Sequence, residues 1–271
     1  MTCSFCPVPV HTQFATAELV GPIVEGGFDP ADDPGWAGSG ARSPAEYARW
    51  AGHLCGMTCL RMALGGDAPA APGAPVPSLF ALRDGALTYG AYTVDDDREI
   101  HGLIYAPFAQ YVRETHGIDA TVHRHLAPDE IPGLLDEGRT VMTSVHYGIR
   151  HPERPAPGRG GHLVLVTSRT ADGDGVHFHN PSGTNAGTRT AQLPLADFER
   201  FFAGRGISLG PGPLRSAGTG TGPGPVRSAE TGPGTGAGMG TGPGPGAGMG
   251  TGPGTGAGMG TGPGTGAGPE A

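Results

Sequence analysis

The order of hydrophobic patterns along the chain predicts an α+β domain, with N-terminal helices packed on an antiparallel sheet. Helix-like spacing prevails before about residue 137, and short apolar runs bounded by Gly, Pro and Asp turns follow it. From residue 210 the chain consists almost entirely of Gly, Pro, Thr, Ala and Met, which bury too little surface to offset the entropy of ordering. We therefore expect one domain over residues 1–209 and a disordered tail over residues 210–271.

The helices are predicted from their start and stop signals. Ser43, Pro44 and Glu46 form a capping box with proline at the first helical position. The next stretch, AGHLCGMTCLRMALGG, predicts a helix that begins at or just after Cys55 and ends at Gly65-Gly66. Further helices are expected over residues 79–87, 106–116, 129–137 and 195–202.

The extended segments are predicted from alternation and from β-branched residues. Residues 8–14 predict a short extended segment, and residues 17–40, with Gly-Gly, Asp-Pro and Gly-Ser-Gly, predict a long surface loop. Strands are expected over residues 118–124, 140–147, 162–167 and 176–180.

Composition and charge exclude several functions. The 271-residue chain has a formal net charge of -8, and the tail is neutral, so all of this charge falls on the folded part. Nucleic acids and anionic membranes are therefore not expected partners. Every basic residue is Arg, which excludes Schiff-base and P-loop lysine chemistry. The N-terminus has no signal-peptide pattern and no apolar run is long enough to span a membrane, so a cytoplasmic location is expected.

Cys55 is the first candidate catalytic residue. At a helix N-terminus, unpaired N–H groups and the helix dipole favour the nucleophilic thiolate. The alternative is a buried small hydrophobic residue, as most free cysteines are. Cys3 and Cys6 form a C-x-x-C pair that could join Cys55 and Cys59 in a zinc site, but zinc would then consume the thiol at the helix start. We expect no metal and no cofactor.

Two further residues could complete a thiol site. His162 follows Gly160-Gly161 at the start of the apolar run LVLV, where a substrate backbone would have room to approach the ring. Asn180 ends the next predicted strand and could orient His162 if the two strands pair antiparallel. The alternatives are a strand-end histidine and an Asn that only forms the NPSG turn. The pairs His123/His125 and His177/His179 lack a third metal ligand and are interpreted as surface histidines.

The motifs CGMTCLRMAL, GGHLVLVTS and HNPSG, in this order, resemble the papain-like cysteine peptidases of the bacteriocin-processing, double-glycine-cleaving group and their soluble relatives. The resemblance implies a papain-like fold over residues 8–209. It also implies that Cys55 is the nucleophile, His162 the base and later acid, and Asn180 the group that orients His162.

The resemblance further implies a glutamine that forms the oxyanion hole with the backbone N–H of the cysteine. Gln13 is our candidate, although in the family this residue lies only a few positions before the cysteine. Arg49 stands at that closer position here. We therefore expect residues 17–54 to be an insertion that could cap the cleft.

The expected function is a thiol hydrolase that cleaves peptide or amide bonds through an acyl-thioester intermediate. A catalytically silent peptide-binding module of the same fold is the alternative, and a transferase or amidase would use the same residues. The expected partner is a peptide or amide substrate. No sequence feature indicates an oligomeric state.

Overall fold

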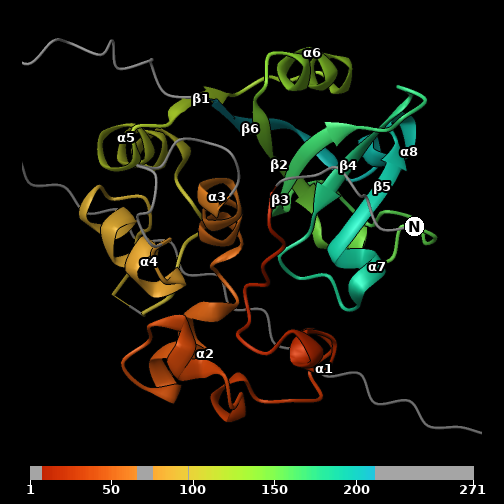
Figure 1. Cartoon of the computed structure of the whole chain (residues 1–271). Coiled ribbons are helices and arrows are strands. Elements are labelled where there is room, and N and C mark those ends of the chain that lie inside the picture. The colour runs from red at the N-terminus through yellow and green to blue at the C-terminus, as the bar shows by residue number, and fades with distance from the viewer. Residues whose placement is uncertain (1–7, 66–75, 97, 211–271) are drawn as a thin grey trace, which may run out of the picture. The chain divides into compact units, whose positions relative to one another are not determined.

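The computed structural model describes residues 8–65, 76–96 and 98–210, which form a group of helices and one six-stranded sheet (Figure 1). The strand order is β1-β6-β2-β3-β4-β5, and every neighbouring pair is antiparallel. This confirms the α+β class, with N-terminal helices packed on an antiparallel sheet. The helices are α1 (Val20–Val24), α2 (Pro44–Ala51), α3 (Cys55–Gly65), α4 (Leu79–Thr88), α5 (Tyr105–His116), α6 (Ile131–Asp136), α7 (Ala186–Arg189) and α8 (Leu195–Glu199). The strands are β1 (Asp119–His123), β2 (Thr140–His146), β3 (Gly161–Arg169), β4 (Gly175–His179), β5 (Thr190–Pro194) and β6 (Phe202–Gly210).

Local signals placed several helix ends correctly. The Ser43 hydroxyl accepts a hydrogen bond from the Glu46 backbone N–H at 3.1 Å and so caps α2. Helix α3 begins at Cys55, and α5 ends at Gly117, whose φ of 67° is the left-handed conformation that glycine adopts without strain. The helix expected over residues 129–137 is shorter, because its first turn is a 3₁₀ segment, Pro128–Glu130.

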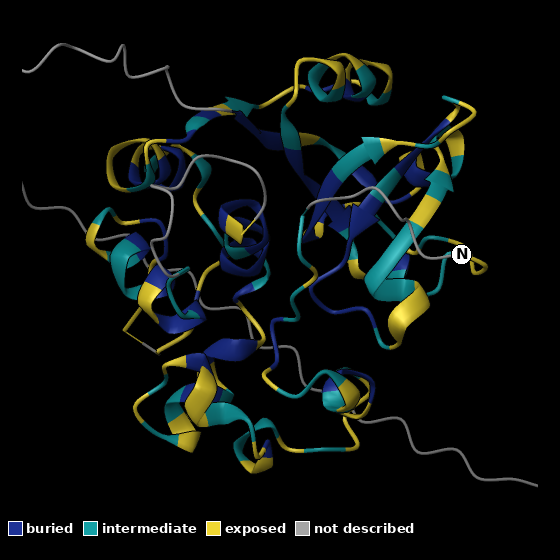
Figure 2. Cartoon of the chain, in the orientation of Figure 1, coloured by how far each residue is buried: buried dark blue, intermediate teal, exposed yellow. Residues whose placement is uncertain are grey.

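The middle of the sheet is buried on both faces, as the alternation along β3 shows. Leu163 and Leu165 pack into the hydrophobic cluster that contains α3, whereas Val164 and Val166 belong to the cluster on the other side. Figure 2 shows α3 buried along nearly its whole length, as expected of a helix enclosed by its neighbours. Strand β3 thus lies between two apolar layers, and this fixes its register.

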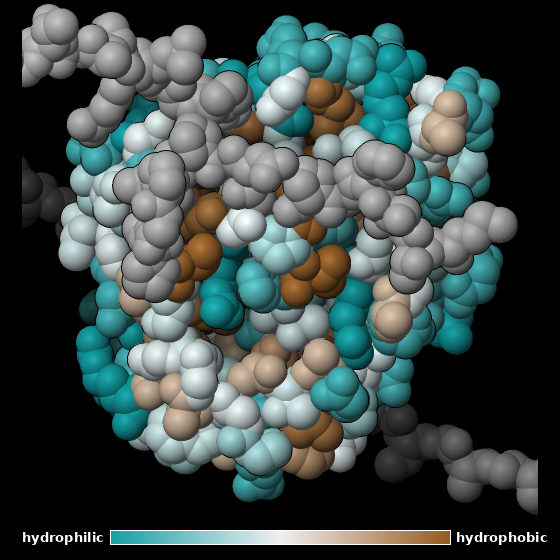
Figure 3. All heavy atoms as spheres, in the orientation of Figure 1, coloured by the Kyte–Doolittle hydropathy of each residue, from teal (hydrophilic) through white to brown (hydrophobic). Residues whose placement is uncertain are grey.

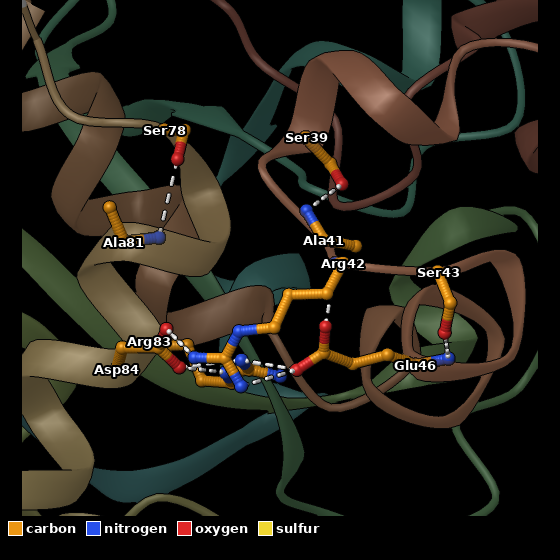
Figure 4. Close-up of polar contacts among 9 residues, drawn as sticks. All are labelled: Ser39, Ala41, Arg42, Ser43, Glu46, Ser78, Ala81, Arg83 and Asp84. Atoms are coloured by element: carbon orange, nitrogen blue, oxygen red, sulfur yellow. Dashed lines mark hydrogen bonds and ion pairs between the residues drawn. The ribbon is translucent and has the colours of Figure 1, made fainter.

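A charged network joins α2 to α4 (Figure 4). Arg83, whose side chain is only 3% exposed, donates to Glu46 Oε1 at 2.8 Å and lies over the rings of Trp50 and Phe80. Burial alone would raise the pKa of Glu46, but hydrogen bonds from Arg42 and Arg83 lower it. The guanidinium is therefore paired and stacked, which is what makes its burial tolerable.

Two predictions near the N-terminus are wrong. Residues 8–14 form no strand and run as irregular backbone. Residues 17–40 are not a featureless loop, since they contain α1 and three 3₁₀ segments. A buried carboxylate organises this region: Asp33 accepts hydrogen bonds from Thr16, Gly35 and the Tyr47 hydroxyl. These bonds depend on contacts between segments, which local propensity does not reveal.

The predictions after residue 180 also need correction. The helix expected over residues 195–202 ends at Glu199, and residues 202–210 form β6, a strand that lies between β1 and β2. Strand β5 and helix α7 were not predicted either. Gly206 is required where β6 lies against the β2 backbone, because a Cβ atom there would lie 2.5 Å from the Met142 carbonyl oxygen.

Apart from Gly210, the predicted tail lies outside the described residues, as do Cys3, Cys6 and Gly66. Among the described residues, no helix is both long and apolar enough to cross a membrane.

Substitution of Gly206 tests the role of β6. A Cβ atom at this position would lie 2.5 Å from the Met142 carbonyl oxygen, so the two strands would have to separate. We expect Gly206→Ala to lower the free energy of unfolding by about 1–3 kcal/mol, measured by urea denaturation. Gly133→Ala in α6 is the matched control, because nothing lies within 4 Å of its added Cβ. Equal stability of the two variants would contradict the close approach of β6 to β2.

Candidate active site

The start of α3 lies beside the start of β3. Gly56 makes this possible, since a Cβ atom there would lie 2.6 Å from Leu103 Cδ2 and 3.2 Å from Leu163 Cδ1. The same contact continues one turn later, where Cys59 Sγ lies 3.7 Å from the Leu163 carbonyl oxygen. The helix start that carries Cys55 therefore packs directly on the strand that carries His162.

Cys55 and His162 both line a cleft of about 720 Å³. The wall also includes Gly52, His53, Leu103, Tyr105, Ser144 and Arg205. Figure 3 shows hydrophobic residues near the middle of the visible face, with hydrophilic residues prevailing towards its rim. The sequence placed these two residues 107 positions apart, and the fold brings them to one cavity.

His162 and Asn180 are joined by a hydrogen bond. Strands β3 and β4 pair antiparallel, with Leu165 opposite His179, so the start of β3 and the end of β4, away from the turn that joins the two strands, bring the two side chains together. His162 Nε2 lies 2.8 Å from Asn180 Oδ1, and both residues are buried. This is the contact that antiparallel pairing of the two predicted strands required.

Two further residues, which sequence reasoning missed, join this contact. Ser182 Oγ lies 3.0 Å from His162 Nε2, and the Arg150 Nε–H donates to Ser182 Oγ at 2.8 Å. Ser182 belongs to the NPSG turn, and its N–H donates to Asn180 Oδ1 at 3.0 Å as in an Asx turn, so the turn motif was a usable signal. Arg150 follows β2 in a 3₁₀ segment and carried no such signal.

This network determines which ring nitrogen carries the proton. The Ser182 N–H needs an acceptor, which assigns the contacting atom of Asn180 as the oxygen. An amide oxygen only accepts, so His162 Nε2 must donate to it. The Ser182 hydroxyl, which accepts from Arg150, can donate its own hydrogen to Asn180 Oδ1 at 3.2 Å. Nδ1 of the neutral ring is then the unprotonated, basic nitrogen.

The electrostatics favour neutral groups at rest. Burial raises the pKa of the Cys55 thiol; N–H groups of Leu163, Gly56 and Cys55 itself, and the Arg150 guanidinium, act against this without cancelling it. The pKa of His162 is lowered to about 4, mainly by burial. The hydrogen bond to Asn180 acts to raise this pKa, and the charge of Arg150 acts to lower it. The site therefore holds a thiol and an imidazole at neutral pH, rather than an ion pair.

Gln13 connects the two sides of the site but does not line the cleft. Its amide Nε2 donates to the carbonyls of Ala51 at 3.1 Å and Gly52 at 3.0 Å, and its backbone N–H donates to Pro181 at 2.9 Å. Both amide hydrogens are thus engaged, while Oε1 is buried and has no partner among the described residues. Arg49 donates to the Arg98 carbonyl oxygen instead of reaching the site.

The candidate metal ligands that the structure describes are mostly far from a coordinating arrangement. Cys55 and Cys59 are free thiols, and Cys59 is fully buried. The interpretation of all four paired histidines as surface residues is wrong for His179, which is 2% exposed. Among the described residues, no group of three or more His, Cys, Asp or Glu side chains is placed to hold a metal ion.

Comparison with known proteins finds similarity at the level of structure. No family model matches the sequence, and no curated protein matches it. The peptidase domain of Streptococcus ComA, a bifunctional ABC transporter of a quorum-sensing pathway, is 14% identical, with 59% of this chain and 93% of that domain covered and a TM-score of 0.39. A double-glycine-motif protease from an AMS/PCAT transporter, solved with its leader peptide, is 16% identical over 58% of this chain and 84% of its own, with a TM-score of 0.36.

A Bacillus anthracis protein named a C39-like peptidase is 13% identical, with 58% of this chain and 88% of that protein covered and a TM-score of 0.40. All three TM-scores lie below 0.5. The chain is thus similar in structure to peptidase domains, one of which is a double-glycine-motif protease.

Proposed function

We propose that this protein is a cysteine peptidase-like thiol hydrolase that cleaves peptide or amide bonds through an acyl-thioester. The observation that most supports this function is the hydrogen bond between His162 Nε2 and Asn180 Oδ1. His162 also lines the same cleft as Cys55. Such a bond leaves Nδ1 free to receive a proton from a thiol.

In the proposed reaction, Cys55 Sγ attacks the substrate carbonyl carbon while its proton passes to His162 Nδ1. The C–N bond then breaks, and the leaving amine takes that proton from His162. Water, deprotonated by His162, attacks the thioester, releases the acid and restores the thiol. Asn180 holds the ring throughout. Ser182, which contacts both Asn180 and the ring, and Arg150, which donates to Ser182, act as positioning residues.

The oxyanion of the tetrahedral intermediate needs N–H donors. The Cys55 backbone N–H, at the start of α3, is one candidate. We propose Gln13 as the second, with the condition that one of its two amide hydrogens leaves the carbonyl of Ala51 or Gly52 when substrate binds. Substrate binding and oxyanion stabilisation would then be coupled.

A catalytically silent peptide-binding module is the second candidate. Two observations favour it: the pKa of the Cys55 thiol is raised rather than lowered, and both amide hydrogens of Gln13 are engaged. In this case the cleft would bind a peptide, and His162 would contribute nothing to the reactivity of the thiol.

Labelling by a peptidyl electrophile distinguishes the two functions. We expect Cys55→Ala to abolish labelling near neutral pH and His162→Gln to slow it about 100-fold or more, because a general base contributes that much. The labelled site is identified by peptide mass spectrometry. Cys59→Ala is the control, because its thiol is fully buried and should not react. Labelling that moves unchanged to Cys59 or Cys3 would reject Cys55 as the nucleophile, and an unchanged rate in His162→Gln would favour the silent module.

The pH dependence of alkylation by iodoacetamide tests the neutral pair. Because the pKa of Cys55 is raised, its thiolate fraction lies below that of a free cysteine, with pKa about 8.5, at every pH. His162, with a pKa of about 4, stays neutral from pH 5 to 9. We expect a rate that rises with pH through 9 and shows no inflection near pH 6.5. A reactive plateau at pH 5–6 would instead show a thiolate–imidazolium pair.

Arg150 variants test the positioning network. The guanidinium lowers the pKa of both Cys55 and His162, so Arg150→Gln should raise both, whereas Arg150→Lys should keep the charge effect and lose the bond geometry. The readouts are the pH profile of alkylation and an NMR titration of His162. Ser182→Ala should in addition cost about 1–3 kcal/mol of stability, because it leaves Arg150 Nε without its acceptor. Titrations that match the unmodified protein in Arg150→Gln would show that Arg150 is only structural.

A further inference from the structure

The wall of the cleft is positively charged, although the chain as a whole is acidic. Arg124 and Arg205 line it together with three histidines, and no Asp or Glu is part of the lining. The net charge of the chain is -8. Within the ranges that the structure describes, neither Arg124 nor Arg205 forms an ion pair. Two exposed cations in the same cleft are therefore available to a ligand.

Arg205 lies in a group of hydrogen-bonding side chains beside His162. Burial raises the pKa of the Tyr105 hydroxyl, at the start of α5, while Ser144 on β2 and Arg205 act to lower it. Ser144 is 2% exposed, so a polar atom is buried in the cleft wall. A Cβ atom at Gly160 would lie 3.4 Å from both Arg205 Nη2 and Ser144 Oγ, which places this group next to the two residues that precede His162.

The two glycines keep this region open. Gly160 and Gly161 have φ values of +83° and +95°, which side chains rarely allow, and nothing lies within 4 Å of a Cβ at Gly161. Apolar residues Leu103, Val122 and Leu163 form another part of the wall. The cleft thus offers apolar surface to the aliphatic part of a substrate, and the guanidinium of Arg205 offers several N–H donors.

We propose that Arg205, with the Tyr105 hydroxyl and Arg124, forms a subsite for a carboxylate of the substrate. The subsite selects peptides that present either an acidic side chain or a terminal carboxylate on the β6 side of His162. The subsite proposal rests on the proposed function, because it takes Cys55 as the reacting group of the same cleft. Formation of the subsite does not require that His162 be an effective base.

Three iodoacetyl probes of nearly equal shape test this subsite. N-iodoacetyl-glutamine amide is neutral, N-iodoacetyl-glutamate α-amide carries a side-chain carboxylate, and N-iodoacetyl-glutamine carries a terminal one. Each alkylates Cys55 with loss of iodide, and the rate of each acid is divided by the rate of the neutral probe. The same ratios with glutathione correct for intrinsic reactivity.

We expect at least one corrected ratio of about five in the unmodified protein, since one charge pair at contact distance in water changes a rate by about that factor. Arg205→Gln should return that ratio to near one, and Tyr105→Phe should reduce it partly. Arg154→Gln is the matched control, because Arg154 is exposed, pairs with Glu153 and lies outside the cleft lining. Raising the salt concentration to 0.5 M should weaken the preference by screening. The acid with the larger ratio identifies the source of the carboxylate.

The ratios are independent of how readily Cys55 ionises, because all probes meet the same sulfur. Corrected ratios of one in the unmodified protein, or ratios that survive both Arg205→Gln and Tyr105→Phe, would overturn the subsite. A raised ratio that Arg205→Gln abolishes, with absolute rates unchanged by His162→Gln, would support the subsite and contradict the hydrolase. The two proposals can therefore fail separately.

Discussion

Strand β3 is the constraint on which the rest of the site depends. It pairs with β2 on one side and β4 on the other, and its two faces pack into different hydrophobic clusters. A shift of one residue would turn its leucines and valines to the wrong layers, so its register is strongly specified. With that register fixed, His162 stands where the turn after β4 delivers Asn180 and Ser182. The polar network at the strand end is thus a consequence of apolar packing further along the strand.

The helical side of the cleft is held by different interactions. Gly56 lets α3 approach β3, and Gln13 joins the end of α2 to the turn after β4 through one backbone bond and two side-chain bonds. Gln13 is buried and contacts both the end of α2 and the turn after β4, so it helps to set the distance between them. This structural role does not depend on whether Gln13 takes part in catalysis. Catalytic geometry in such a cleft depends on this separation, since small displacements of reacting groups cost large factors in rate.

Burial and local donors act in opposite directions on the thiol. Burial raises the pKa of Cys55, whereas backbone N–H groups and the Arg150 guanidinium favour the thiolate. The same guanidinium disfavours a charged imidazole at His162. The resting pair is therefore neutral, and proton transfer would accompany attack rather than precede it. Positive charge also stabilises an incoming carboxylate or a developing oxyanion. Arg150 supplies such charge near the thiol, and Arg124 and Arg205 supply it on the cleft wall.

The sequence by itself determined the α+β class, the helix start at Cys55, the strand that carries His162 and the strand that Asn180 follows. These features rest on local signals, namely a capping box, helical or alternating periodicity and Gly-Pro turns, and such signals act over a few residues. The tertiary structure alone decided that residues 202–210 are a strand between β1 and β2, that Asp33 organises residues 17–40, and that Arg150 reaches Ser182. It also decided that His179 is buried and that Gln13 donates to carbonyls of α2 and the residue after it. Each of these depends on contacts between residues far apart in the chain, and burial and hydrogen-bond partners of that kind are set by packing rather than by local propensity.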